Sequence, residues 1–342
     1  MDMNGNRESN DQALTWLEHR EGRVSIEERA DGRRRVLVYP EPGTFVSRAE
    51  CITAYPVEMI TRILQVKSPG SLCDEIARDE DPDYLGLFLR YSLLGYLPEE
   101  AFREARILDF GSGSGASTVV LARMFPDTEI VGVELEPDLI AIAKLRAEHY
   151  GLANLTFRES PDPESLPTDL GGQFKFINLG AVYEHLLPAE RPRLLTQLWS
   201  VLEVGGVIFV NQLPYRFYPV EAHTTGLPLL NYLPDRLAYK VAKRFSPRIE
   251  PGETWANLLR RGIRGGTERS VRRDLLRGGG DIRTLTPTMM SLRDHAELWY
   301  GYSMQGRPHP MKRVMRTGFR AVSRVTGTPV APGLSLAFEK LT

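Results

Sequence analysis

A glycine-rich segment near the middle of the chain has the residue types and spacing to bind a small charged molecule. In residues 107–118 (ILDFGSGSGAST) an apolar stretch ends in an aspartate, and three glycines follow at alternate positions before a helical pattern begins. Glycine permits a tight turn and lets a ligand approach bare backbone. The first turn of a helix also offers unpaired N–H groups to a carboxylate or phosphate. The candidate binding residues of this turn are Asp109, Gly111, Ser112, Gly113 and Gly115.

A carboxylate stands where it can complete that site. The next apolar stretch, residues 129–134, ends in Glu134, followed by Leu135. An acidic residue at the end of the second strand of a nucleotide-binding sheet accepts hydrogen bonds from the hydroxyls of a ribose. We therefore predict that Glu134 and Leu135 contact the same ligand as the glycine turn.

Two further segments carry groups that could move a proton. Glu184 and His185 follow a predicted strand, and His223 lies in the loop 212–226, which is rich in Tyr, His, Glu and Pro. A hydroxyl nucleophile needs a base, and a neutral imidazole is suited to that role near pH 7. The catalytic candidates are therefore His223, His185 and Glu184, and either Glu184 or Glu221 could orient an imidazole. We favour His223 as the base, because its expanded loop lies where an acceptor would approach.

The elements that must position these residues follow a strand–helix alternation from residue 106 onward, which is typical of a parallel sheet covered by helices. Strands are expected at 106–110, 129–134, 155–158, 175–179 and 207–211, near Leu285, and at 334–340. Helices are expected at 116–124, 137–150 and 189–202. Ligands of such a sheet bind beyond the carboxyl ends of the strands.

The rest of the chain is predicted to form three additions to residues 101–212, the cofactor-binding core. Residues 1–100 form an N-terminal extension, in which residues 23–39 make a hairpin around Asp31-Gly32 and helical spacing follows over 49–97. Residues 213–266 form a substrate cap, since long ordered loops usually bind something. Residues 267–342 complete the sheet and include a basic helix.

The glycine motif and its companions resemble the class I S-adenosylmethionine-dependent methyltransferases. In that family Asp-x-Gly-x-Gly-x-Gly follows the first strand, and an acidic residue ends the second. Residues 181–187 (AVYEHLL) and 201–209 (VLEVGGVIF) are similar to two later family segments. The resemblance implies a Rossmann-like α/β fold with a mostly parallel seven-stranded sheet, S-adenosyl-L-methionine as methyl donor, and further cofactor contacts at Glu159, Ser160 and Leu179. Two positions depart from the pattern: Lys175 stands where relatives often have Asp, and the adenine-binding segment is blurred over 158–162.

This resemblance implies methyl transfer, with O-methylation of a glycan, lipid-linked sugar or related small molecule as the leading reading. The alternatives are N- or C-methylation of a small metabolite, and a non-catalytic cofactor-binding scaffold of the same fold. Gly111, Gly113 and Ala116 also fit a dinucleotide pattern, but Asp109 and Gly205-Gly206 favour methyl transfer.

A metal-dependent variant is disfavoured by one residue. Some members of the family bind a divalent ion through Glu-x-x-Glu-His, and here Ala181 stands at the first position. Only Glu184 and His185 remain, joined at best by His223. The sequence therefore predicts no metal site.

Charge distribution indicates possible partners. The net charge is −1, but residues 240–324 carry +12 and the rest of the chain −13, an asymmetry that indicates an anionic ligand or surface. Residues 310–326 have the pattern of a basic amphipathic helix, and two explanations stay open: contact with an anionic membrane, or packing of its apolar stripe on the domain. Nucleic acid is disfavoured by the acidic body. The N-terminal residues lack the order of a secretory signal, and two cysteines are too few for a disulfide framework, so we expect a cytoplasmic protein. Peripheral contact with the inner membrane face stays open as an alternative.

Overall fold

The computed structural model describes residues 14–304 and 309–342, and its contacts divide the chain between Asp81 and Pro82. The sequence had placed this boundary near residue 100. The difference arises because helix α3 (Leu87–Leu94) buries Phe88, Leu89 and Leu93 in the core of the second unit. Each unit is described on its own below.

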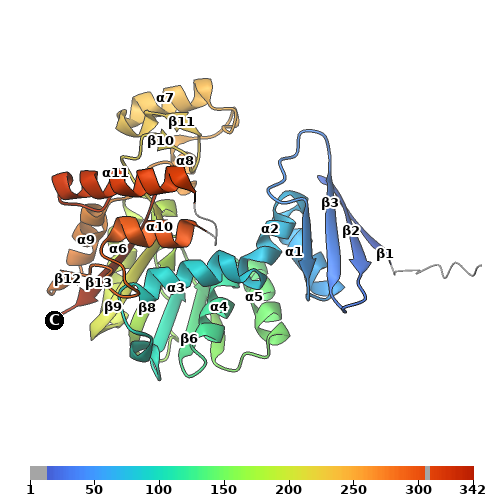
Figure 1. Ribbon diagram of the computed structural model, residues 1–342, viewed down its shortest axis with the longest axis horizontal. Helices are drawn as coiled ribbons and strands as arrows, with labels where there is room; N and C mark the ends of the chain where they lie inside the picture. Colours follow the sequence, from blue (N-terminus) through green and yellow to red (C-terminus); the bar gives the residue numbers. More distant parts are fainter. Residues whose placement is uncertain (1–13, 305–308) are drawn as a thin grey trace, which may run out of the picture. The chain divides into compact units, whose positions relative to one another are not determined.

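The first unit is an antiparallel sheet with two helices (Figure 1). The hairpin expected at residues 23–39 is present as β2 and β3, in which Val24, Ile26, Val36 and Val38 alternate into the core. Residues 50–53, which the helical spacing had included, instead form an edge strand that pairs with β3. The elements are β1 (Leu14–His19), β2 (Gly22–Glu28), β3 (Arg34–Pro40), β4 (Glu50–Thr53), α1 (Val57–Lys67) and α2 (Pro69–Glu80).

The second unit contains the predicted seven-stranded sheet, in the order β12-β13-β9-β8-β5-β6-β7. β13 is antiparallel to both of its neighbours, and the other pairs are parallel. The strands are β5 (Arg106–Phe110), β6 (Glu129–Glu134), β7 (Leu155–Glu159), β8 (Phe174–Gly180), β9 (Leu202–Pro214), β12 (Ile282–Thr284) and β13 (Gly333–Lys340). The Rossmann-like fold expected from the sequence is confirmed, and its switch in strand order lies between β5 and β8, next to the glycine turn.

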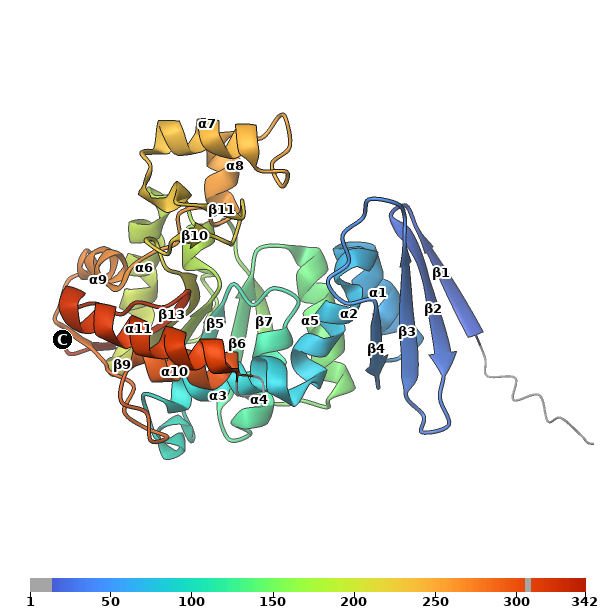
Figure 2. The same cartoon turned by 45° about the horizontal axis from the view of Figure 1, so that its top comes forward.

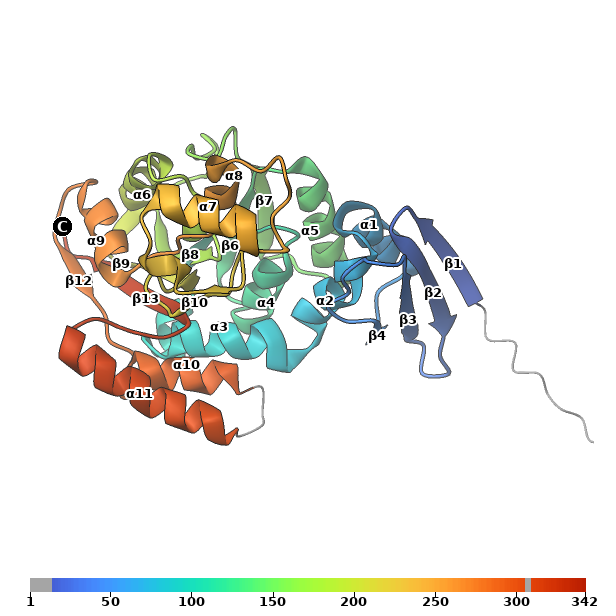
Figure 3. The same cartoon turned by 90° about the horizontal axis from the view of Figure 1, so that it is seen from above.

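Helices cover both faces of this sheet. Figure 3 shows α6 and α9 on one side and α3 and α10 on the other. One core includes Leu194, Leu198 and Val271, whereas the other includes Val119, Ala143 and the α3 side chains. The covering elements are η1 (Pro82–Gly86), α3, η2 (Glu99–Phe102), α4 (Ala116–Met124), α5 (Pro137–His149), η3 (Tyr183–His185), α6 (Glu190–Val201), α9 (Glu268–Leu276) and α10 (His295–Ser303).

The expected insertion after the fifth strand lies beyond the carboxyl end of β9 (Figures 1 and 2). It consists of β10 (Val220–Glu221), β11 (Leu227–Pro228), η4 (Leu230–Tyr232), α7 (Asp235–Phe245) and α8 (Trp255–Arg260). A small core of its own holds it together, built on Leu230, Ala238, Ala242, Leu258 and Ile263. We call residues 213–266 the cap.

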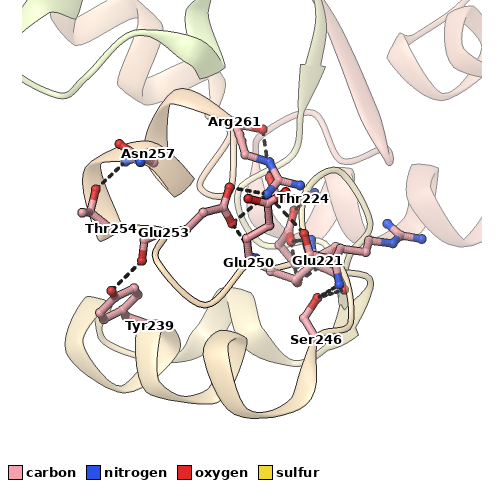
Figure 4. Close-up of polar contacts among 11 residues, drawn as sticks. Glu221, Thr224, Tyr239, Ser246, Glu250, Glu253, Thr254, Asn257 and Arg261 are labelled. Carbon is pink, nitrogen blue, oxygen red and sulfur yellow. Dashed lines mark hydrogen bonds and ion pairs between the residues drawn. The ribbon is translucent and has the colours of Figure 1, made fainter. Parts of the chain in front are cut away.

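Hydrogen bonds and ion pairs connect the cap loops (Figure 4). The Arg261 guanidinium binds both carboxylate oxygens of Glu253 at 2.7 and 2.8 Å, and its carbonyl accepts a bond from Thr224. Other arginines of the basic segment 258–274 are engaged in the same way, in the pairs Arg260–Glu190, Arg264–Asp235 and Arg273–Asp274. Four arginines of this segment are therefore paired with carboxylates of the protein itself rather than left for an anionic ligand.

Helix α11 (Pro310–Thr326) forms as predicted, but only part of its apolar stripe packs on the domain. Met315 and Phe319 pack on the domain, while Arg320 turns inward to Asp294 and Glu297. Met311, Val314, Val322 and Val325 are left exposed, at 65, 73, 46 and 88%. The cause is that Asp294 and Glu297 attract part of the basic face toward the protein. Among the described residues no helix is long and apolar enough to cross a membrane.

Candidate functional site

The glycine turn is shaped by contacts beneath it. Gly111, Gly113 and Gly115 all have positive φ (73°, 56° and 81°), and a Cβ on Gly111 would lie 2.4 Å from Val182. Asp109 is buried and accepts hydrogen bonds from Ser117, Thr118 and Asn178 at 3.0, 2.7 and 2.7 Å. Burial raises the pKa of Asp109, and these donors act against the rise. Asp109 thus anchors the first turn of α4 to the sheet.

Glu134 faces the glycine turn from the end of β6. Its Oε2 accepts the Gly113 amide at 2.7 Å, and its Oε1 accepts the Leu135 and Glu136 amides at 2.7 and 3.2 Å. These bonds hold the carboxylate in one orientation. Because a carboxylate has about four acceptor sites, it can still accept a hydrogen bond from a hydroxyl.

A cavity of about 350 Å³ opens beside these groups. Of the predicted cofactor residues, Gly111, Glu134, Leu135 and Ser160 line it. Glu159 is exposed and does not; Asp162 lies in the wall instead, along with Phe110, Val133, Pro163, Val182, Leu186 and Arg260. Leu179 is fully buried in the core.

The two remaining predicted cofactor residues act indirectly in this structure. Ser112 is buried, its amide bonded to the Val133 carbonyl, and Gly115 caps α4. A Cβ on Gly115 would lie 2.6 Å from the Cβ of Ala143 in α5, so this glycine allows two helices to approach. Both residues shape the turn rather than line the cavity.

A second cavity, of about 320 Å³, lies between β9 and the cap. Its wall includes Gln212, Tyr215, Tyr218, Asn231 and His223. Glu221 also lines it, but its carboxylate is occupied by the amides of Thr224 and Thr225 and by the Thr225 hydroxyl. Glu221 therefore holds its own loop, and no hydrogen bond joins its carboxylate to an imidazole among the described residues.

The three catalytic candidates lie close together, and two of them stand in the walls of different cavities. His185 lines the first cavity and His223 the second, and their ring centroids are 5.4 Å apart. Glu184 is fully buried behind them, with Oε1 3.9 Å from His185 Nε2. One ligand atom from each side chain lies within 4.8 Å of the other two. We call Glu184, His185 and His223 the EHH cluster.

The electrostatics of the cluster follow from burial. Burial raises the pKa of Glu184 to about 8. Desolvation, with His185 nearby, lowers the pKa of His223, so this ring is neutral at pH 7. Tyr183, the neighbour of Glu184, is committed elsewhere, because its hydroxyl donates to Asp274 at 2.8 Å.

Arg260 is a site residue that sequence reasoning missed. Its side chain lines the first cavity and binds Glu190, and its carbonyl lies 2.6 Å from His185 Nδ1. The position is at the end of cap helix α8, 75 residues from His185. No local pattern marks such a pairing; only the docking of the cap on η3 creates it.

Comparisons with known proteins agree with this geometry. A family model described as a methyltransferase domain matches residues 107–206. Trans-aconitate 2-methyltransferase of Deinococcus radiodurans is 34% identical over 119 residues, which are 35% of this chain and 41% of that protein. Demethylmenaquinone methyltransferase of Thermus thermophilus is 32% identical over 109 residues, 32% of this chain and 47% of that protein.

Among solved structures, the S-adenosylmethionine-dependent methyltransferase SibL aligns with a TM-score of 0.42 at 14% identity, covering 74% of this chain and 55% of that one. The chain spans less than half the length of the two curated relatives named above. The shared region contains the glycine turn and Glu134, whereas the cap lies outside the family match.

Proposed function

Because residues 107–206 form a class I S-adenosylmethionine-dependent methyltransferase domain, we propose that this protein transfers a methyl group from S-adenosyl-L-methionine to an oxygen atom of a glycan, a lipid-linked sugar or a related small molecule. The observation that carries the proposal is the EHH cluster, which lies between the cavity beside Glu134 and the cavity beneath the cap. The first cavity would hold the methyl donor and the second the acceptor.

The reaction needs little from the protein beyond alignment and one proton acceptor. The acceptor oxygen attacks the sulfonium methyl carbon, the carbon–sulfur bond breaks, and its electron pair stays on sulfur. The hydroxyl proton must leave, and the neutral His223 imidazole in the wall of the second cavity can take it. A cavity lined by Tyr215, Tyr218, Gln212 and Asn231 offers ring faces and amides, groups that suit a sugar or another polar ring.

Substitution of His223 tests the role of the cluster. In His223→Ala the turnover number should fall by about 10²–10⁴-fold with S-adenosylhomocysteine affinity unchanged, since general-base catalysis contributes about that factor. His19→Ala, which removes an imidazole from the first unit, is the matched control and should keep wild-type turnover. A raised KM with normal kcat would make His223 a positioning residue and favour an intrinsically nucleophilic nitrogen or carbon acceptor. Wild-type values of both constants would refute the assignment.

Failure to bind S-adenosylhomocysteine at all would contradict both methyl transfer and a cofactor-binding scaffold, and would leave a protein that keeps only the fold. Calorimetric titration of the wild-type protein decides this point before any acceptor is known. The acceptor itself can be sought as a product that gains the mass of one methylene unit when an extract is incubated with the protein and the methyl donor.

We also propose peripheral contact of helix α11 with an anionic membrane surface, at the inner membrane face. Its exposed apolar side chains Met311, Val314, Val322 and Val325 follow one stripe, and the exposed Arg313 and Arg324 flank it. Apolar insertion beside basic side chains is the arrangement that binds anionic lipids. A lipid-linked acceptor would be presented at such a surface.

Co-sedimentation with vesicles tests this contact. The protein should bind vesicles containing phosphatidylglycerol and not pure phosphatidylcholine vesicles. Val314→Glu should weaken binding, and Thr317→Glu, which makes the same charge change beside the stripe, should weaken it less. Equal losses would leave only a charge effect, and no binding to either vesicle would refute the contact.

A further inference from the structure

We propose that the EHH cluster binds one divalent transition-metal ion, held by a carboxylate oxygen of Glu184 and by ring nitrogens of His185 and His223. The binding claim stands on geometry alone; only the role of the ion in methyl transfer rests on the proposed function. The local sequence predicted no such site, because Ala181 stands where the Glu-x-x-Glu-His motif has its first glutamate. The third ligand comes instead from the cap, 38 residues beyond His185.

Glu184 points to a missing partner. The residue is 0% exposed, and neither carboxylate oxygen accepts a hydrogen bond from any described residue. The Arg191 guanidinium acts on this carboxyl only through its charge, because it bonds to the backbone carbonyl of Glu184 and stacks over the Tyr183 ring. A buried carboxyl group without partners is unusual, because buried polar groups are normally hydrogen-bonded, paired or bound to metals. A cation bound at its oxygens would supply the missing partner.

His185 is held in the tautomer that a metal requires. Its Nδ1 lies 2.6 Å from the carbonyl oxygen of Arg260, and only an N–H can make that contact. Nε2 of the neutral ring then carries the free lone pair, and this atom faces Glu184 at 3.9 Å. A backbone carbonyl that orients a histidine through its second nitrogen is a common feature of metal-binding sites.

His223 comes from the cap and is the third member of the EHH cluster. His223 lies in the loop after β10. The absence of a side chain at Gly262 leaves space for it, because a Cβ there would lie 2.6 Å from His223 Cδ2 and 3.1 Å from Glu184 Cγ. With donor atoms of the three side chains all within 4.8 Å of one another, side-chain rotations would bring them to bonding distance of a single ion.

The donor set defines the class of ion. Two imidazoles and one carboxylate suit Zn²⁺, Fe²⁺, Mn²⁺ or Co²⁺ better than the oxygen-seeking Mg²⁺ or Ca²⁺. Three protein ligands leave coordination positions for water or an acceptor oxygen. Since His223 would be a ligand in the loaded protein, the ion would then replace it in activating the hydroxyl, by lowering the pKa of a bound oxygen.

Binding can be measured without knowing the acceptor. CoCl₂ and MnCl₂ are titrated into the metal-free full-length protein, with calorimetry for both ions and visible absorption for cobalt. We expect one ion per chain and a cobalt spectrum typical of mixed nitrogen and oxygen ligands. Glu184→Gln and His223→Asn should each weaken binding at least tenfold, whereas His19→Asn should leave it unchanged. S-adenosylhomocysteine titration of every variant shows that the fold is retained.

Three results would overturn the proposal. The wild-type protein could fail to bind a stoichiometric amount of metal, Glu184→Gln and His223→Asn could bind metal with wild-type affinity, or His19→Asn could lose as much metal affinity as they do. Its failure is distinguishable from failure of the proposed function. A metal-free protein that methylates an acceptor retains the function and loses the metal site. A protein that binds cobalt through the EHH cluster, but neither binds the cofactor nor methylates, retains the site and loses the function.

Discussion

Replacing Glu134 by alanine should weaken binding of S-adenosylhomocysteine at least tenfold. The carboxylate is held toward the glycine turn by the Gly113, Leu135 and Glu136 amides, and it keeps acceptor capacity for ribose hydroxyls. A charge-assisted hydrogen bond of this kind contributes about 1.5–3 kcal/mol. Since about 1.4 kcal/mol is a factor of ten in Kd, loss of one such bond already gives an effect of at least tenfold.

The assay is calorimetric titration at constant salt and pH, with two matched variants. Glu134→Gln keeps the shape and one acceptor oxygen, so its affinity should fall between those of the wild type and Glu134→Ala. Glu129→Ala removes a carboxylate from the opposite end of the same strand, where it pairs with Arg106, and should leave affinity unchanged. The melting temperature of each variant separates loss of binding from loss of fold.

A ribose-modified ligand sharpens the test. Wild-type protein should discriminate against 2′-deoxy-S-adenosylhomocysteine, and Glu134→Ala should lose most of that discrimination, because the coupling energy belongs to the contact itself. An affinity for S-adenosylhomocysteine in Glu134→Ala within twofold of wild type would refute the assignment of Glu134 to the ribose. Undiminished discrimination in that variant would refute it too.

Two further predictions concern stability. Gly115→Ala should lower the free energy of unfolding by about 2–4 kcal/mol, since it combines a φ of 81° with a Cβ 2.6 Å from that of Ala143; Gly151→Ala, with a φ of 61° and open space around it, should lose only about 1 kcal/mol in the same denaturation assay. Burial lowers the pKa of His295 to about 4. The unfolded ring binds a proton below about pH 6.5 and the folded ring does not, so stability should fall by about 3 kcal/mol between pH 6.5 and 4 and be unaffected above pH 7. His295→Gln should flatten that part of the stability–pH curve; an unchanged slope would show that other groups cause it.

The central sheet could be predicted because its information is local. Strands β5 and β6 and helix α4 occur at the expected residues, since each is a short apolar run bounded by glycine, proline or charged residues. Edge strands carried weaker signals. β4 is four residues long with only two of them buried, so its pattern was overridden by the helical spacing that follows.

The basic helix shows where periodicity alone misleads. The sequence places apolar residues on one stripe of α11 and basic residues around the other side, and one of its two explanations packs the apolar stripe on the domain. In the structure the boundary between the two faces meets the domain, because Asp294 and Glu297 draw Arg320 inward while Phe319 packs beside it. Partners contributed by another helix decide a rotation that the helix itself cannot specify.

The candidate site divides in the same way. By itself the sequence determined the cofactor end: the glycine turn, Asp109 and Glu134 follow one another within 26 residues, and the register of two adjacent parallel strands brings them to one edge of the sheet. Only the tertiary structure decided the acceptor end. It buried Glu184 without a partner, turned the Arg260 carbonyl onto His185, and occupied Glu221 with its own loop. It also brought His223 to the other two, because a cap with its own small core docks on η3, and such long-range contacts depend on packing rather than on any local pattern of residues.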